Sequence, residues 1–531
     1  MRADLTVVNA RIYTMDADHP MAEALAVCGG RIVSVGDRDA VRATVGPDTE
    51  ELDAQGRLLL PAFTDAHIHL VEYGQSLQRL QLDQETSIDA VVRRVAERAG
   101  KATPGTWIRG LGWNRNLWQG SPLPTRQDLD AAAPNVPVLL DSKDLHAAWV
   151  NTAGLRAAGI SAQTPDPPGG VIERDARTGE PTGVLKEGPA VRLVSDHIPH
   201  ASLAELQVAI DAATCNLHRL GITSVHVPEG YRELRAVMDL WHRGDLGLRI
   251  LWMVAAEQLP CLVQAGLTGG FGDEWLSLGP VKAFADGALG SRTADMFDAY
   301  ETEPRNHGVQ VTSTESLTAL VGECTMGGWN VAIHAIGDRA NSRVLDALEK
   351  HWREWKTRGL RPRIEHVQLL APQDLPRLGA MGLVASMQPI HCTSDMEMAE
   401  RYWGRRCSGA YAWRSLLESG AHLTFGSDAP VEEPSVFRGL YAAVTRRREN
   451  GPPLKGWYPQ QRLSVSEAVY CYTMGAAYAA GQERETGSIT FGKRADLILL
   501  SEDIFSQPSE ALLETQVDLT MIGGEIAYVS K

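Results

Sequence analysis

The feature that most constrains the fold is a regular alternation of short apolar segments with helical stretches through the middle of the chain. This alternation is typical of β–α units, which build a parallel sheet. We identify eight candidate strands, at residues 58–64, 223–227, 248–254, 281–285, 331–333, 363–365, 384–387 and 423–426. Eight such strands in succession favour a closed (β/α)8 or TIM barrel over an open doubly wound sheet, and they place the chain in the α/β class.

Both ends of the chain are instead rich in short strand-like segments. These segments lie at residues 5–8, 10–14, 24–27 and 31–35, and again at 487–489, 495–500 and 524–529. Since each end is too short to fold well alone, we expect one small β-sandwich built from both termini. The predicted boundaries are 1–57 for the first part of the sandwich, 58–465 for the barrel, and 466–531 for the last helix with the rest of the sandwich.

The stretch between the first predicted strand and the next helix is unusually long. It has roughly 130 residues, far more than a loop between a strand and a helix requires. We interpret residues 71–200 as an inserted subdomain that lies over the mouth of the barrel.

Composition excludes several classes of protein. The 531 residues are 44% hydrophobic, enough for a large core and more than one domain. A net charge of −15 argues against nucleic-acid partners and anionic membranes, because no basic surplus exists to neutralise phosphates. The first residues do not resemble a signal peptide, and the chain has no apolar run of the roughly 18 residues that span a membrane. The seven cysteines are scattered without C-x-x-C spacing, so we expect reduced thiols and a cytoplasmic protein.

Residues that can bind metals follow several predicted strands. His67 and His69 close the first strand two positions apart, so both side chains point the same way in an extended chain. His334, His366 and Asp428 end the fifth, sixth and eighth strands. Barrel enzymes keep their active sites at the carboxyl ends of the strands, so we expect these five residues to converge there. Imidazole and carboxylate ligands suit zinc, although manganese, iron and cobalt are chemically possible.

Lys282 lies within the apolar fourth strand, where an unpaired ammonium group is costly to bury. Reaction with carbon dioxide would convert its amine into a carbamate, which can bridge two metal ions about 3.5 Å apart. Alternatively, Lys282 is a cation paired with a carboxylate such as Asp286, or a neutral amine that acts as a base.

Four further residues are candidates for a substrate pocket: Trp113, Asp286, Arg292 and His391. Each has a structural alternative, since Asp286 and Arg292 can pair with each other and Trp113 can belong to a core. The chain contains no G-x-S-x-G elbow, no Walker A sequence and no dinucleotide-binding pattern. Serine-hydrolase and nucleotide-binding functions are therefore disfavoured.

Several motifs together resemble the amidohydrolase superfamily, in particular its YtcJ-like branch (amidohydrolase type 3). The matching segments are residues 65–69 (DAHIH), 142–151, 183–187, 282–294, 334–338, 365–366, 388–391, 426–430 (GSDAP) and 487–497. The resemblance covers nearly the whole chain. One departure lies at residues 225–230, where many relatives carry an aspartate after the histidine, and we interpret His226 as a pocket residue.

The resemblance implies a binuclear metal centre. His67 and His69 would bind the more buried metal with Asp428, while His334 and His366 would bind the second metal. A carboxylated Lys282 would bridge the two ions, which we expect to be zinc. One ion per chain remains an alternative. Relatives also lead us to expect a homodimer.

The predicted activity is hydrolysis of a carbon–nitrogen bond in an amide, N-acyl or N-formyl group of a small molecule. A metal-activated hydroxide would attack the substrate, and Asp428 would shuttle the proton. The alternatives are a deaminase or an ester-type hydrolase on the same centre, and a non-catalytic binding or regulatory homologue. Retention of every proposed ligand argues against the last of these.

Overall fold

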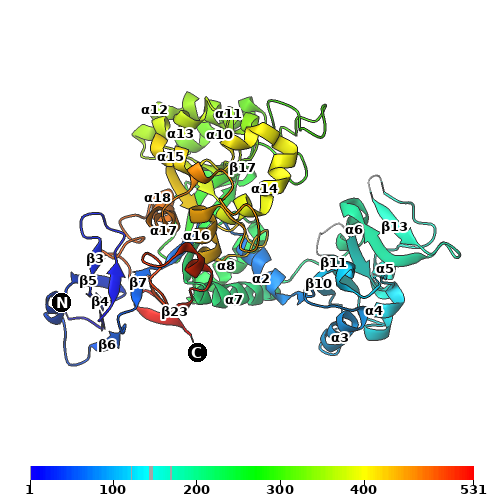
Figure 1. Cartoon of the computed structure of the whole chain (residues 1–531), viewed down its shortest axis with the longest axis horizontal. Coiled ribbons are helices and arrows are strands. Elements are labelled where there is room, and N and C mark those ends of the chain that lie inside the picture. The colour runs from blue at the N-terminus through cyan, green and yellow to red at the C-terminus, as the bar shows by residue number, and fades with distance from the viewer. Residues whose placement is uncertain (1, 104, 121, 143–146, 168–169, 531) are drawn as a thin grey trace. The chain divides into compact units, whose positions relative to one another are not determined.

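The computed structural model describes residues 2–103, 105–120, 122–142, 147–167 and 170–530. The chain divides into two compact units (Figure 1). One unit comprises Met1–Gly74 and Ile210–Lys531, and the other comprises Gln75–Ala209.

The larger unit contains the predicted barrel, an eight-stranded sheet in which each strand is parallel to its neighbours. Its strands in order are β8 (Phe63–Asp65), β15 (Ile222–Val227), β16 (Arg249–Ala255), β17 (Leu276–Phe284), β18 (Val331–Ala335), β19 (Arg363–His366), β20 (Val384–Met387) and β21 (His422–Phe425). The first and last strands meet just beyond β8, where the backbone N–H of Ala66 donates to the carbonyl of Phe425 at 3.1 Å. The TIM-barrel prediction is therefore confirmed.

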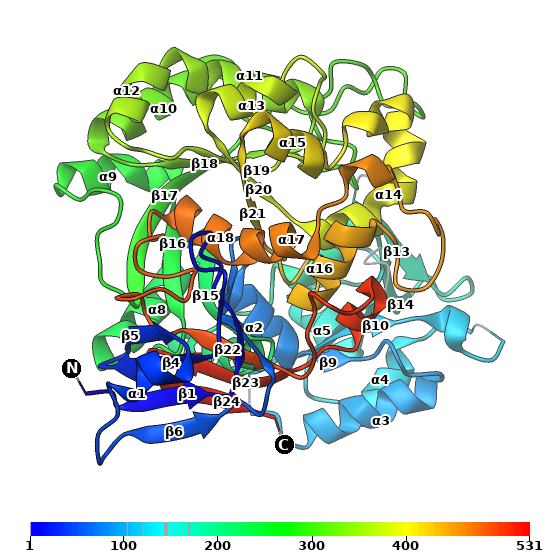
Figure 2. The ribbon, with the colours of Figure 1, turned by 60° about the vertical axis from the view of Figure 1, so that its left-hand side comes forward.

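Helices occupy the connections between these strands, and further helices precede the first strand and follow the last (Figure 2). In the larger unit and its boundaries they are α1 (Arg38–Arg42), α2 (Leu70–Gln78), α7 (Leu203–Arg219), α8 (Tyr231–Arg243), α9 (Leu259–Gln264), α10 (Thr314–Gly327), α11 (Asp338–Lys350), α12 (Trp352–Thr357), α13 (Leu375–Met381), α14 (Pro389–Trp403), α15 (Trp413–Ser419), α16 (Val436–Thr445), α17 (Val465–Tyr472) and α18 (Met474–Ala480). Short 3-10 helices lie at η2 (Ala256–Gln258), η3 (Gly404–Gly409), η4 (Pro459–Gln461) and η5 (Ser509–Leu513).

Local sequence explains where these helices begin and end. For α10, the hydroxyl of Ser313 accepts a hydrogen bond from the backbone N–H of Ser316 at 3.1 Å. Gly328 ends the same helix in the left-handed conformation, with φ of 75°, which glycine adopts without a steric penalty.

Both termini contribute to a β-sandwich in the same unit. One sheet has the order β5-β4-β1-β6, with β1 (Leu5–Val8), β4 (Ala24–Cys28), β5 (Arg31–Gly36) and β6 (Glu50–Asp53). The other has the order β24-β23-β22-β7-β2-β3, with β2 (Arg11–Tyr13), β3 (Met21–Ala22), β7 (Leu58–Pro61), β22 (Leu497–Leu500), β23 (Val517–Ile522) and β24 (Glu525–Val529). Leu59 pairs with Leu499 across β7 and β22, so strands from the two ends of the sequence lie side by side (Figure 2). Val7 and Leu25 of the first sheet share one core with these leucines.

The strand predicted at residues 58–64 is wrong as a single element. Its first part is β7 in the sandwich, and its second part is β8 in the barrel. The change falls between Ala62, whose N–H donates to the Asp496 carbonyl, and Phe63, whose N–H donates to the Gly221 carbonyl. A continuous apolar run is compatible with either sheet, so the sequence pattern alone does not show where the chain leaves the sandwich sheet and enters the barrel sheet.

The smaller unit is inserted between the first and second barrel strands, as predicted. Its sheet has the order β13-β14-β12-β11-β10-β9, with β9 (Leu80–Gln81), β10 (Ile108–Trp113), β11 (Val138–Ser142), β12 (Ala147–Val150), β13 (Val171–Arg174) and β14 (Pro181–Lys186). Its helices are α3 (Ile88–Ala99), η1 (Arg115–Leu117), α4 (Arg126–Ala132), α5 (Thr152–Ala157) and α6 (Glu187–Ser195). Of the motif at residues 142–151, positions 143–146 lie outside the described residues. That this unit covers the barrel mouth stays a prediction.

In the described part of the chain, no helix combines the length and the apolar character needed to cross a membrane.

Candidate metal centre

The centre is built where the first and last barrel strands meet. Asp65, the last residue of β8, accepts hydrogen bonds from the backbone N–H groups of His67 at 3.1 Å and Ser427 at 3.0 Å. Gly426 follows β21 and permits this close approach, since a Cβ atom there would lie 2.5 Å from the backbone nitrogen of His67. A side chain at position 426 would therefore displace the backbone that carries the histidines.

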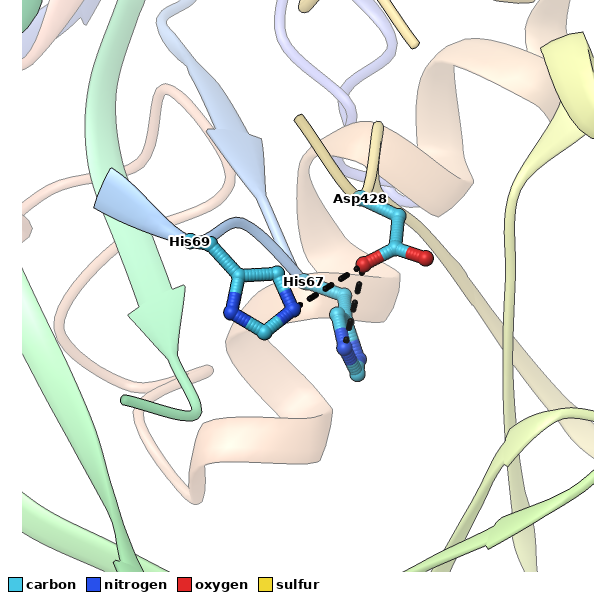
Figure 3. A group of neighbouring side chains, drawn as sticks. All are labelled: His67, His69 and Asp428. Carbon is cyan, nitrogen blue, oxygen red and sulfur yellow. Dashed lines mark ion pairs between the residues drawn. The ribbon is translucent and has the colours of Figure 1, made fainter. Parts of the chain in front are cut away.

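Two histidine side chains lie close to the same carboxylate oxygen at this junction. The Nε2 atoms of His67 and His69 lie 3.6 and 3.3 Å from Oδ1 of Asp428 (Figure 3). Asp428 has a φ of 60°, a conformation that is unfavourable for a residue with a side chain and is often found at functional sites. Burial alone would raise the pKa of Asp428, but the hydrogen bond from His69 and the nearby imidazoles outweigh it and lower that pKa. The carboxylate is therefore ionised, as a metal ligand must be.

A buried carboxylate fixes the orientation of His67 from behind. The Nδ1–H of His67 donates to Oε2 of Glu365 at 2.5 Å, and Glu365 itself is held by Nε and Nη2 of Arg363 at 2.5 and 3.0 Å. With its proton on Nδ1, His67 directs the lone pair of Nε2 toward Asp428, which is the arrangement that carboxylate–histidine–metal triads use. The roles of Glu365 and Arg363 were not predicted. The sequence feature that could have indicated them is the presence of two charged residues within a predicted apolar strand.

His226 belongs to the same buried network. Its Nδ1 accepts a hydrogen bond from Nη1 of Arg363 at 3.0 Å, and the residue is 2% exposed. The structure thus places His226 beside Arg363 in this buried network, and its interpretation as a pocket residue stays a prediction.

A second group of possible ligands lies beside the first. His366, His391 and Asp428 each offer a ligand atom, and these atoms lie within 4.8 Å of one another, as do those of His67, His69 and Asp428. The Nδ1–H of His366 donates to Oε1 of Gln388 at 2.9 Å, which orients this ring. His391, predicted for the substrate pocket, is thus brought among the possible ligands.

His334 adjoins this second group without belonging to either. Its ring centroid lies 4.5 Å from that of His366, and its Nε2–H donates to the carbonyl of Gly287 at 2.9 Å. Burial, followed by the charge of Lys282, lowers the pKa of His334 to about 4, so the ring is neutral at physiological pH. Neutral imidazole is the form that binds metals. The role of His334 as a ligand stays a prediction.

Lys282 is buried beside the histidines and is not paired with Asp286. The carboxylate of Asp286 instead accepts backbone hydrogen bonds from Asp295, Ile336 and Gly337, at 2.8 to 3.0 Å. No ion pair of Lys282 is found among the described residues, and burial lowers its pKa to about 8. Both the carbamate and the neutral-base interpretations require unprotonated amine, and this lowered pKa gives Lys282 a larger unprotonated fraction than an ordinary lysine has.

The remaining pocket candidates have structural partners. Arg292 forms an ion pair with Glu303 at 2.6 Å, so the predicted alternative pairing with Asp286 is wrong. Trp113 lies in the core of the smaller unit, where its indole N–H donates to the Leu140 carbonyl at 2.8 Å. Asp286, Arg292 and Trp113 as substrate-binding residues stay predictions.

The residues present suit a divalent cation. Ionised carboxylate and neutral imidazoles are a donor set typical of zinc and related metals. In addition, Nε2 of His391 is buried, has no hydrogen-bond partner among the described residues, and lies 3.9 Å from Oδ2 of Asp428. Buried polar atoms are normally paired, so an unpaired nitrogen beside an ionised carboxylate fits a position that receives a cation.

Comparison with known proteins gives consistent matches over nearly the whole chain. A sequence profile described as "Amidohydrolase family" matches residues 50–528. The chain is 34% identical to the putative amidohydrolase YtcJ of Bacillus subtilis, over 97% of this chain and 98% of that protein. It is 30% identical to the N-substituted formamide deformylase of Arthrobacter pascens, over 99% of this chain and 98% of that protein.

A solved structure resembles the fold closely. It is that of an uncharacterized metal-dependent hydrolase from Pyrococcus furiosus, with a TM-score of 0.79 and 28% sequence identity. The match covers 94% of this chain and 100% of the other.

Proposed function

Since this chain belongs to the amidohydrolase family, we propose that it hydrolyses a carbon–nitrogen bond in an amide, N-acyl or N-formyl group of a small molecule. The observation that carries the proposal is the approach of His67 Nε2 and His69 Nε2 to a single oxygen of Asp428. The similarity to an N-substituted formamide deformylase, which extends over 99% of this chain, supports the class of bond.

His67, His69 and Asp428 would hold one divalent cation, which we propose to be zinc. His366 would contribute to a second site, with either His334 or His391, and a carbamate on Lys282 would bridge the two. The chemistry that a divalent cation supplies in such a centre is Lewis acidity, which acidifies water and polarises a carbonyl group.

Asp428 is the proposed proton shuttle. Its carboxylate takes one proton from the attacking water, whose oxygen bonds to the carbonyl carbon, and delivers that proton to the nitrogen as the carbon–nitrogen bond breaks. The products are a carboxylic acid and an amine. Glu365 keeps His67 in the required tautomer, and Gln388 orients His366.

The test combines metal analysis with hydrolysis of a panel of N-formyl and N-acetyl amines. We expect bound metal and turnover in the wild type, and a loss of about 100- to 10,000-fold in kcat/KM for Asp428→Asn. Asp298→Asn, which makes the same change at an exposed aspartate, should match the wild type. A protein that binds no metal, or metal-loaded Asp428→Asn with full activity, contradicts the proposal.

A further inference from the structure

A hollow of about 530 Å³ opens beside Lys282, in the larger unit. It is bordered by residues at the carboxyl ends of β15, β16 and β17, the ends that also carry the metal centre. Its volume lies within the range of small-molecule sites, roughly 300–1,000 Å³. Its wall is mostly apolar, with Pro228, Met253, Phe284, Val311 and Leu320 as the larger side chains.

The ring of Phe284 joins this hollow to the metal centre. The Nζ atom of Lys282 lies 4.9 Å from the centroid of the ring, and the imidazole centroid of His334 lies 5.3 Å from it. A group that occupies the hollow therefore contacts the same ring as two residues of the centre. This places the hollow next to Lys282 and His334, two residues proposed for the metal centre.

The apolar wall is held in place but left open. The hydroxyl of Thr312 donates to the Phe284 carbonyl at 2.7 Å, and the N–H of Val311 donates to the Ala285 carbonyl at 3.0 Å. Phe284 and Val311 are nevertheless 47% and 55% exposed. Neighbouring apolar side chains that are fixed and uncovered beside a reactive centre fit a preformed surface for an apolar ligand.

The charged residues of the hollow do not favour an anionic ligand. Glu229 uses its carboxylate to accept the backbone N–H groups of Val71 and Glu72, each at 2.9 Å, in the first turn of α2. Glu257, in η2 after the end of β16, is exposed. Lys282 is the single cation among the described residues that line the hollow, and it also interacts electrostatically with Glu365 and Asp428 of the metal centre.

We propose that this hollow binds an uncharged apolar substituent, either an aryl or a branched alkyl group, that the substrate carries next to the scissile bond. This inference rests on the proposed function for the identity of that bond. Binding of the substituent itself depends only on the wall of the hollow, so the two proposals are tested separately.

The first test measures hydrolysis of N-benzylformamide, N-methylformamide and N-(4-carboxybenzyl)formamide. We expect kcat/KM to be at least about 10-fold higher for the benzyl compound than for the methyl compound, with the carboxylated compound the poorer of the two benzyl substrates. Val311→Trp fills the hollow and should remove the preference for benzyl. Val309→Trp is the matched control, because Val309 is 48% exposed in the same loop and does not line the hollow. Equal effects of the two variants, or a preference for the carboxylated compound, would overturn the proposal.

The second test needs no hydrolysis. Binding of benzyl alcohol, followed by ligand-observed NMR on the metal-loaded full chain, should be present in the wild type and Val309→Trp and absent in Val311→Trp. If Val311→Trp does not fold, Phe284→Ala should weaken the same binding at least about threefold by removing the largest apolar surface of the wall. Binding without turnover of any formamide would support the hollow and contradict the proposed bond. Absence of binding, or binding that neither variant changes, would overturn the inference.

Discussion

Glu365→Gln tests whether the carboxylate behind His67 prepares the histidine for a metal. Glu365 is fully buried and accepts three hydrogen bonds, two from Arg363 and one from Nδ1 of His67. A glutamine has nearly the same shape, but only one of its two terminal atoms is an acceptor. If its oxygen remains with Arg363, its NH2 group faces Nδ1 of His67 and must donate to it. The proton of His67 then moves to Nε2, the nitrogen that faces Asp428.

Two magnitudes follow from this geometry. Loss of the partner that fixes a ligating histidine lowers metal affinity by about 10- to 100-fold. Loss of the negative charge also leaves Arg363 buried beside a neutral group, which should lower the free energy of unfolding by about 3–5 kcal/mol. A variant that is only less stable should keep the wild-type metal Kd as long as it is folded. The loss of metal affinity in folded Glu365→Gln should therefore be distinguishable from its loss of stability.

The assay is a competitive titration of the folded, metal-free protein against a fluorescent chelator, with urea unfolding measured in parallel. Ser386→Ala is the control, because Ser386 accepts a hydrogen bond from Arg363 at 2.7 Å but does not contact His67 among the described residues. It should lower stability by about 1–3 kcal/mol while the metal Kd stays within about twofold of the wild type. Folded Glu365→Gln with wild-type metal affinity would refute the assigned role.

Three further outcomes are expected. Asp496→Ala should lower the free energy of unfolding by about 3 kcal/mol without changing kcat/KM. The change removes the buried carboxylate 2.7 Å from Nε of Arg249 and leaves this buried arginine only the half-exposed Glu274, at 3.3 Å, as an ionic partner; unchanged urea unfolding would contradict this. The hydrogen bond from Arg414 lowers the pKa of Glu467 to about 2. The ionised Glu467 carboxylate therefore stabilises the fold fully above its unfolded-state pKa near 4.5, and this stabilisation is lost as the pH falls toward 2. In Glu467→Gln, the free energy of unfolding should depend less on pH between about 4.5 and 2. An unchanged pH dependence over this range would contradict the prediction. Metal-loaded protein supplied with ¹³C-bicarbonate should show a carbamate resonance that Lys282→Ala lacks, and an unmodified amine in fully metal-loaded protein would exclude the bridge.

Much of the barrel was predictable because its strands are short, apolar and separated by helices. The prediction of 384–387 coincides with β20, whereas β17 begins at Leu276, five residues before the predicted start at Val281. Gly279 and Pro280 lie in the missed part, and both disfavour a strand when the sequence is considered alone. The structure accommodates them at an irregularity in the pairing of β16 with β17.

The positions of the possible ligands were predictable for a different reason. A barrel brings the carboxyl ends of all its strands to one face, so residues at strand ends are expected to converge. Their hydrogen-bond partners were not predictable, because His67 and Glu365 are 298 positions apart and nothing local relates them. His391 was not predicted among the possible ligands because α14 begins at Pro389, immediately after β20, and this first turn brings the ring near Asp428.

The location of the centre also relates metal binding to closure of the barrel. His67 and His69 follow the first strand, whereas Asp428 follows the last, and Asp65 joins the two segments through the N–H of Ser427, 362 positions away. In an unfolded or open chain these groups are far apart, so the complete ligand set exists only when β8 and β21 meet. A metal that binds this set stabilises the folded state alone, by about 2.7 kcal/mol when its free concentration is 100 times the Kd. The same contacts that form the centre therefore make the closed barrel more stable in the presence of metal than in its absence.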